Sequence, residues 1–120
     1  MSEGTRNVLV VEENIDVREA MTAFLEGEGY HVVGAANGRE ALVQLRTSVI
    51  FCVVLLDLGM PVMDGWEFRA QQLGEPAMAS IPVVIVSVDG LLAQDEGAPA
   101  AVFPKPVGWG HLLETVQQHC

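Results

Sequence analysis

The sequence contains few basic residues, few cysteines and no long apolar run. Six of its 120 residues are Lys or Arg, against sixteen Asp plus Glu, which gives a formal net charge of −10. A nucleic-acid surface needs clustered Lys and Arg to release counterions from phosphates, so this balance argues against DNA or RNA as a partner. It fits a protein that holds a metal cation or docks on a basic partner.

No apolar stretch approaches the length of a membrane span, which argues against a membrane partner. The amino terminus "MSEGTRNVLVV" is also unlike a signal peptide, because it has no basic start followed by an apolar run and a small-residue cleavage site. We therefore expect a soluble cytoplasmic protein. A length of 120 residues suits one domain, residues 1–120, with a core of its own.

Two cysteines, Cys52 and Cys120, are too few to indicate a disulfide framework. Cys52 stands inside the apolar run "VIFCVVLLD", so we expect it to be buried. In a cytoplasmic protein both residues are expected to be reduced thiols.

Short aliphatic runs alternate with helical patterns along the chain. The runs lack polar alternation, which is typical of strands covered on both faces, and they lie at 7–12, 30–35, 49–57, 81–87 and 100–104. Five strand–helix repeats indicate a parallel sheet with right-handed crossovers and helices on both faces. The sequence thus predicts a flavodoxin-like, doubly wound α/β fold with five strands in the order 2-1-3-4-5.

Three of the predicted helices have a clear apolar stripe. The first begins after the N-cap candidate Asn14 and ends near Gly27 and Gly29, and its stripe is Val17, Met21, Phe24 and Leu25. The second has Ala41, Leu42 and Leu45 on one side, and the last has Trp109, Leu112, Leu113 and Val116. Weaker helical patterns occupy 66–73 and 91–96.

Polar side chains follow the predicted strands where the strands end. Glu12 and Glu13 stand at the carboxyl end of the first strand and Asp57 at that of the third, so the expected topology brings three carboxylates to one crevice. Mg²⁺ would relieve their mutual repulsion, since it prefers oxygen ligands. The fourth strand ends at Ser87 and the fifth precedes Lys105. An acid nucleophile, a metal, a hydroxyl and a lysine are the groups that phosphoryl transfer needs.

The pieces "VVEEN", "DLGMPVMDG", "VVIVS" and "PKP" each stand at the end of a predicted strand. With this spaced set, nearly the whole chain resembles the receiver domains of two-component response regulators, including the single-domain chemotaxis type. The resemblance implies that Asp57 accepts a phosphoryl group from a sensor histidine kinase or phosphotransfer protein. It further implies a switch that signals by contact with a downstream protein and is not an enzyme in its own right.

The resemblance also implies roles for the surrounding residues. Glu13 and Asp57 would bind Mg²⁺ through their side chains, Gly59 through its backbone carbonyl, and Glu12 mostly through water. Ser87 would donate a hydrogen bond to the phosphoryl group, and Lys105 would pair with its charge.

Five features depart from the usual family pattern. Glu13 is longer than the usual Asp, and Gly59 has no side chain where many relatives have a polar one. Val88 replaces a small residue, and Val102 stands where an aromatic switch residue is expected. The interval from Ser87 to Lys105 is about one helical turn shorter than usual, which predicts a shortened fourth helix.

Two alternatives stay open at this point. The departures are compatible with a pseudo-receiver that binds partners without being phosphorylated. A Mg²⁺-dependent phosphatase of the haloacid-dehalogenase type also uses an aspartyl nucleophile, but that family places it on the first strand with a second Asp two residues later. Here the acid is on the third predicted strand, and Gly59 stands at that spacing.

Overall fold

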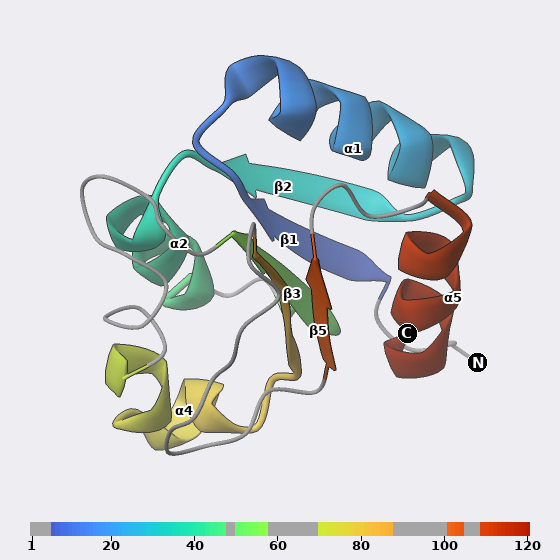
Figure 1. The fold of residues 1–120 in the computed structure, drawn as a ribbon. Helices are drawn as coiled ribbons and strands as arrows, with labels where there is room; N and C mark the ends of the chain where they lie inside the picture. Colours follow the sequence, from blue (N-terminus) through green and yellow to red (C-terminus); the bar gives the residue numbers. More distant parts are fainter. Residues whose placement is uncertain (1–5, 48–49, 58–69, 88–100, 105–108) are drawn as a thin grey trace.

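The structure is a computed structural model that describes residues 6–47, 50–57, 70–87, 101–104 and 109–120. Within these ranges, helices alternate with strands as the sequence predicts (Figure 1). The strands are β1 (Asn7–Val11), β2 (His31–Ala35), β3 (Val53–Asp57), β4 (Val83–Ser87) and β5 (Ala101–Pro104). The helices are α1 (Ile15–Gly27), α2 (Gly38–Leu45), α4 (Pro76–Ala79) and α5 (Trp109–His119); residues 70–73 are also helical.

All neighbouring strands of the sheet are parallel, in the order β2-β1-β3-β4-β5. The predicted 2-1-3-4 order is confirmed, and β5 pairs with β4 from Val84↔Ala101 to Ser87↔Pro104. Because the chain leaves β1 toward β2 and later returns to β3 on the other side, the carboxyl ends of β1 and β3 flank the point where the strand order reverses.

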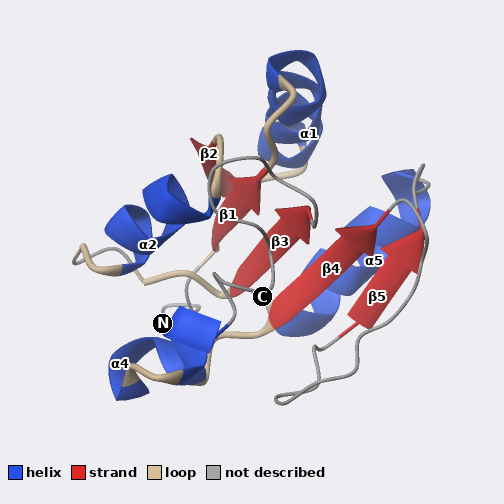
Figure 2. Ribbon diagram, turned by 60° about the vertical axis from the view of Figure 1, so that its left-hand side comes forward, coloured by secondary structure: helices blue, strands red, loops and turns tan. Residues whose placement is uncertain are grey.

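Alternate strand residues point to opposite faces of the sheet, and each face has its own core. Helices α2 and α4 cover one face and α1 and α5 the other, and Figure 2 shows α2 and α4 together on one side. The first core contains Leu9, Val11, Ala35, Ala41, Leu42, Leu45, Phe51, Val54, Leu56, Met78 and Val83. The second contains Val8, Val10, Met21, Leu25, Tyr30, Val32, Val53, Leu55, Val84, Leu112 and Val116.

Helix α1 begins as predicted, because the Asn14 side chain accepts hydrogen bonds from the backbone N–H groups of Asp16 and Val17. Its predicted apolar stripe is right at Met21 and Leu25, which are buried, and wrong at Val17, which is 42% exposed. The turn after α1 needs Gly29, whose φ is +99°.

Helix α5 buries Leu112 and Val116 as predicted, but Trp109 is 45% exposed. The Trp109 ring packs at a tilt against Phe24 of α1, with 4.9 Å between ring centroids. Of the predicted helix over 66–73, residues 70–73 are helical. Residues 66–69, the predicted pattern over 91–96 and the shortened fourth helix lie outside the described residues.

The segment before β4 is attached to the rest of the fold by polar contacts. The buried amide of Gln72 donates to the backbone carbonyls of Met78 and Ile81, at 2.8 and 3.0 Å. At the surface, Arg46 follows α2 and forms a 2.6 Å ion pair with Glu75, the N-cap of α4. The Gln72 hydrogen bonds thus connect residues 70–73 to α4 and to the segment before β4, and the ion pair joins the end of α2 to the start of α4.

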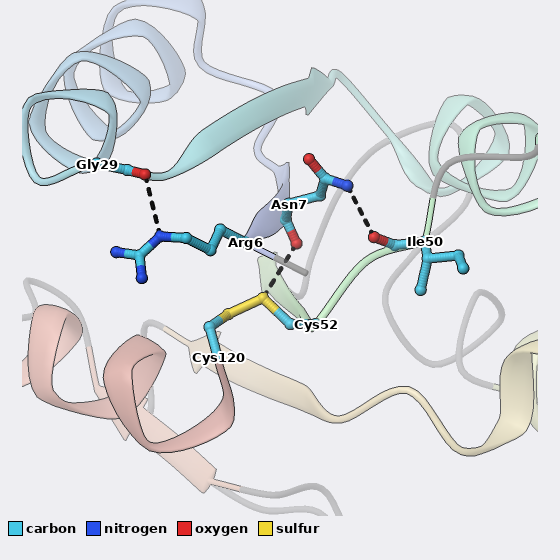
Figure 3. The surroundings of a disulfide bond; sticks show 6 residues. All are labelled: Arg6, Asn7, Gly29, Ile50, Cys52 and Cys120. Carbon is cyan, nitrogen blue, oxygen red and sulfur yellow. Dashed lines mark hydrogen bonds between the residues drawn. A yellow bond between two sulfur atoms is a disulfide. The ribbon is translucent and has the colours of Figure 1, made fainter. Parts of the chain in front are cut away.

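The prediction for the cysteines is wrong. Cys52 and Cys120 form a disulfide, and Cys52 is partly exposed. The strand β3 starts at Val53, later than the predicted residue 49, so Cys52 lies at the amino-terminal edge of the sheet and not inside a strand. The end of α5, which is distant in the sequence, lies beside Cys52 at this edge (Figure 3).

Polar contacts surround this disulfide at the same edge (Figure 3). The Asn7 amide donates to the carbonyl of Ile50 at 2.9 Å, and Arg6 Nε donates to the carbonyl of Gly29 at 3.2 Å. The Arg6 guanidinium also lies over the Tyr30 ring, 4.6 Å from its centroid. These contacts connect the starts of β1, β2 and β3.

Across the segments that the structure describes, no helix has both the length and the apolar character needed to cross a membrane.

Candidate functional site at the carboxyl edge of the sheet

The strand register brings three of the predicted site positions into one row. Val11 pairs with Leu56, so Glu12, which follows Val11, lies level with Asp57 on the neighbouring strand. Asp57 in turn pairs with Val86, next to Ser87. Neighbouring strands are about 4.8 Å apart, so the backbones of Glu12, Asp57 and Ser87 meet at one edge, as the sequence predicts.

Glu12 is held firmly at this edge, with 5% of its surface exposed. Its carboxylate Oε2 accepts a hydrogen bond from the backbone N–H of Asn14 at 3.1 Å. Its own backbone N–H donates to the carbonyl of Ala35 at 3.0 Å, which extends the β1–β2 pairing by one residue. The position of this buried acid is therefore fixed by backbone contacts on both sides.

Glu13 differs from Glu12 because it is exposed to solvent. It stands between the end of β1 and the N-cap Asn14, in the short connection to α1. The two acids that the sequence groups together thus have different surroundings: one is packed against the sheet, and the other is accessible from outside.

Arg18 is a residue of this edge that the sequence reasoning missed. Its Nη1 donates to the backbone carbonyl of Glu12 at 2.7 Å, and its side chain lies against Gly34 of β2. A Cβ at position 34 would stand only 3.1 Å from Arg18 Cδ, so the glycine leaves the space through which the arginine reaches the loop. The signal in the sequence was an Arg one turn after the N-cap, opposite a glycine in the next strand.

The remaining predicted site residues are described less fully. For Asp57, Ser87 and Val102 the structure places the backbone in β3, β4 and β5. Gly59 and Lys105 lie outside the described residues, although Lys105 directly follows Pro104, the partner of Ser87 in the register.

Within the part of the chain that the structure describes, no group of three or more His, Cys, Asp or Glu residues could hold a metal ion. Of the four predicted Mg²⁺ ligands, the structure describes Glu12 and Glu13 fully. It places the backbone of Asp57 alone, and Gly59 lies outside the described residues. As donors, these groups supply the oxygen atoms that Mg²⁺ prefers.

Residues 8–117 match the response regulator receiver domain family. Response regulator RR06 of Streptococcus pneumoniae is 36% identical over 97 residues, covering 81% of this chain and 41% of RR06. The chain thus spans less than half the length of this relative.

Two solved structures have the same fold. The chemotaxis protein CheY4 of Vibrio cholerae has a TM-score of 0.83 and 27% identity, covering 98% of this chain and all of CheY4. The response regulator protein TrrA of Thermotoga maritima, solved in complex with Mg(2+)-BeF, has a TM-score of 0.83 at 24% identity, covering 97% of this chain and all of TrrA.

The match therefore covers both cores and all five strands, from Val8 in β1 to the last turn of α5. The chain belongs to the response regulator receiver domain family of two-component signalling.

Proposed function

We propose that Asp57 is the phospho-acceptor of this receiver domain. The observation that carries the proposal is the register of β1 and β3, which puts the backbone of Asp57 level with the buried Glu12 at the point where the strand order reverses. The four residues of β3 before Asp57, residues 53–56, are buried and apolar, so Asp57 is the polar residue that this central strand brings to the edge.

Mg²⁺ is the proposed cofactor, held by Glu12, Glu13, Asp57 and the backbone carbonyl of Gly59. Two features support the fit: the donors are all oxygens, and the Glu12 carboxylate is oriented by the Asn14 N–H. When bound, the metal would neutralise the charge that these carboxylates and the incoming phosphoryl group bring together. The TrrA structure supports such a site by analogy, because TrrA was solved with Mg(2+)-BeF.

The proposed reaction moves one phosphoryl group between proteins. An oxygen of the Asp57 carboxylate forms a bond to phosphorus as the bond from phosphorus to the histidine nitrogen of the donor breaks, and the histidine leaves with the electron pair. Ser87 would donate a hydrogen bond to the transferred group, and Lys105 would pair with its negative charge. Glu12, braced by Arg18 and Asn14, would keep the acid loop in place during the transfer.

In this proposal residues 1–120 form a single cytoplasmic receiver domain. Its donor is a sensor histidine kinase or a phosphotransfer protein, and its output is contact with a downstream protein. It turns over no substrate of its own beyond loss of the phosphoryl group by hydrolysis.

The test is phosphorylation by acetyl phosphate in the presence of Mg²⁺, followed by intact-protein mass spectrometry. We expect the parent to gain the mass of one phosphoryl group and Asp57→Asn to gain none. Asp16→Asn, which changes an exposed acid in the first turn of α1, should label like the parent. Equal labelling of the parent and Asp57→Asn would overturn the proposal. Failure of both to label would favour the alternative hypothesis of a pseudo-receiver, which binds partners without being phosphorylated.

A further inference from the structure

The disulfide between Cys52 and Cys120 connects two distant parts of the chain. Cys52 immediately precedes β3 and Cys120 immediately follows α5, 68 residues later. Their Cα atoms are 5.3 Å apart, within the range that disulfides span without movement of the backbone. The bond therefore joins the last turn of α5 to the amino-terminal edge of the sheet (Figure 3).

Each cysteine is also anchored by its own backbone, independently of the sulfur–sulfur bond. The Cys52 N–H donates to the carbonyl of Asn7 in β1 at 2.9 Å, and the Cys120 N–H donates to the carbonyl of Val116 in α5 at 2.9 Å. Neither hydrogen bond involves a sulfur atom, so we expect both to remain after reduction of the disulfide and to keep the two cysteines close to each other.

The surroundings of Cys52 also suit a free thiol. Its Sγ lies 3.2 Å from the carbonyl oxygen of Asn7. A disulfide sulfur has no hydrogen to donate, but a thiol at the same place can donate to that oxygen. Reduction therefore replaces a covalent bond by a weak hydrogen bond without leaving a buried polar group unsatisfied.

We propose that Cys52 and Cys120 form a reversible thiol–disulfide site that takes low-molecular-weight thiols as its redox partners. In oxidation, the thiolate of one cysteine attacks an oxidised small-thiol disulfide and releases one reduced thiol. The second cysteine then displaces the other small thiol from the mixed disulfide, so two electrons and two protons pass to the small-thiol pair. In a reducing compartment such bonds are transient and respond to oxidation, which fits the proposed cytoplasmic location.

The site would control the attachment of α5. In the reduced protein α5 is held by apolar contacts, mainly through Leu112 and Val116, whereas in the oxidised protein its last turn is also bonded to the sheet. The bond closes a loop of 68 residues, so it removes many conformations from the unfolded chain. Because the bond lies before β3 and Asp57 ends β3, oxidation acts at the edge opposite the proposed phosphorylation site.

The experiment equilibrates the full chain in glutathione buffers of graded ratio, traps free thiols by alkylation and identifies the species by mass spectrometry. We expect one intramolecular disulfide. The oxidised fraction at each glutathione ratio should be the same whether the experiment starts from the reduced or from the oxidised protein. The oxidised parent should melt about 10 °C above the reduced parent. Cys52→Ser and Cys120→Ser should each melt at the same temperature in both buffers.

Three outcomes would overturn the proposal: glutathione adducts or disulfide-linked dimers in place of the intramolecular bond, an oxidised fraction that depends on the starting protein, or equal melting of the oxidised and reduced parent. None of these readouts involves phosphorylation. Failure of this proposal is thus separable from failure of the proposed phosphorylation at Asp57.

Discussion

The carboxyl-terminal and amino-terminal edges of the sheet hold different kinds of residue. At the carboxyl edge, a buried acid, Glu12, is braced by the N–H of Asn14 and the guanidinium of Arg18. At the amino edge, Asn7 reaches Ile50 and the disulfide joins Cys52 to Cys120. The contacts at the carboxyl edge place the Glu12 carboxylate beside the end of a neighbouring strand, whereas the contacts at the amino edge connect strands and helices to one another.

This difference suggests a division between chemistry and stability. Changes to the acids at the carboxyl edge should affect phosphoryl transfer more than folding, and changes at the amino edge should affect folding more than phosphoryl transfer. Each variant below is therefore measured both by labelling with acetyl phosphate and by chemical or thermal unfolding.

The largest effect is expected for Glu12→Gln at the carboxyl edge. The amide oxygen of Gln can still accept from the Asn14 N–H, so stability should change little, but a charge near the proposed metal is lost. We expect the Mg²⁺ concentration for half-maximal labelling to rise about tenfold or more. Glu19→Gln, at an exposed position on α1, is the matched control and should leave it unchanged.

Normal labelling of Glu12→Gln together with much easier unfolding would contradict the assignment of the carboxyl edge to phosphoryl transfer and the amino edge to stability. Glu12 would then be a structural acid.

The next effect is expected for Gly29→Ala at the amino edge. A side chain at φ +99° costs about 1–2 kcal/mol of unfolding free energy, and the added Cβ would also approach the Arg6 guanidinium at 3.4 Å. Urea unfolding measures the loss. Labelling should stay within about twofold of the parent, because a protein with a stability of about 5–15 kcal/mol stays almost entirely folded after such a loss.

Gly27→Ala is the control for this change, because a Cβ at position 27 meets nothing within 4 Å and the residue ends α1 without positive φ. It should leave stability equal or slightly higher. Equal losses for both alanines would contradict the conformational explanation.

A smaller effect is expected for Asn14→Ala. The change removes the side-chain cap of α1 and should cost about 1 kcal/mol, while the backbone N–H that orients Glu12 is kept. Asn37→Ala removes the corresponding cap of α2 and should cost a similar amount. A drop in labelling for Asn14→Ala alone would indicate that its side chain also belongs to the site.

The smallest effect is expected for the exposed pair Arg46–Glu75, which joins the end of α2 to the start of α4 at the surface. The hydrogen bond from Arg46 lowers the pKa of the Glu75 carboxyl from its usual 4.5. The ion pair therefore stabilises the fold at pH values above 4.5, and this contribution is lost as the pH falls through the lowered pKa. The melting temperatures of Glu75→Gln and the parent should therefore converge in acid. A difference that grows in acid would contradict this assignment.

The 2-1-3-4 strand order was predictable because it follows from local patterns, and the strand order in turn fixes which strand ends are neighbours. Uninterrupted aliphatic runs indicate covered strands, and the parallel topology then brings Glu12 and Asp57 to one edge. Asn14 was predictable for the same reason, since a cap acts on N–H groups two and three residues later.

The failures concern contacts between residues far apart in the chain. Val17 lies on the apolar stripe of α1 yet is exposed, since a position in the helical repeat is buried only where another element packs against it. The role of Arg18 depends on Gly34 in a neighbouring strand, and the disulfide depends on where α5 ends relative to β3. No periodicity within one segment carries that information.

The most direct test of the proposed phospho-acceptor is the mass of the intact protein after incubation with acetyl phosphate and Mg²⁺. We predict one added phosphoryl group on the parent, located at Asp57 by peptide mapping and absent from Asp57→Asn. An adduct on any other residue, or a parent that gains no phosphoryl group while its Asp57 is intact, would contradict the account.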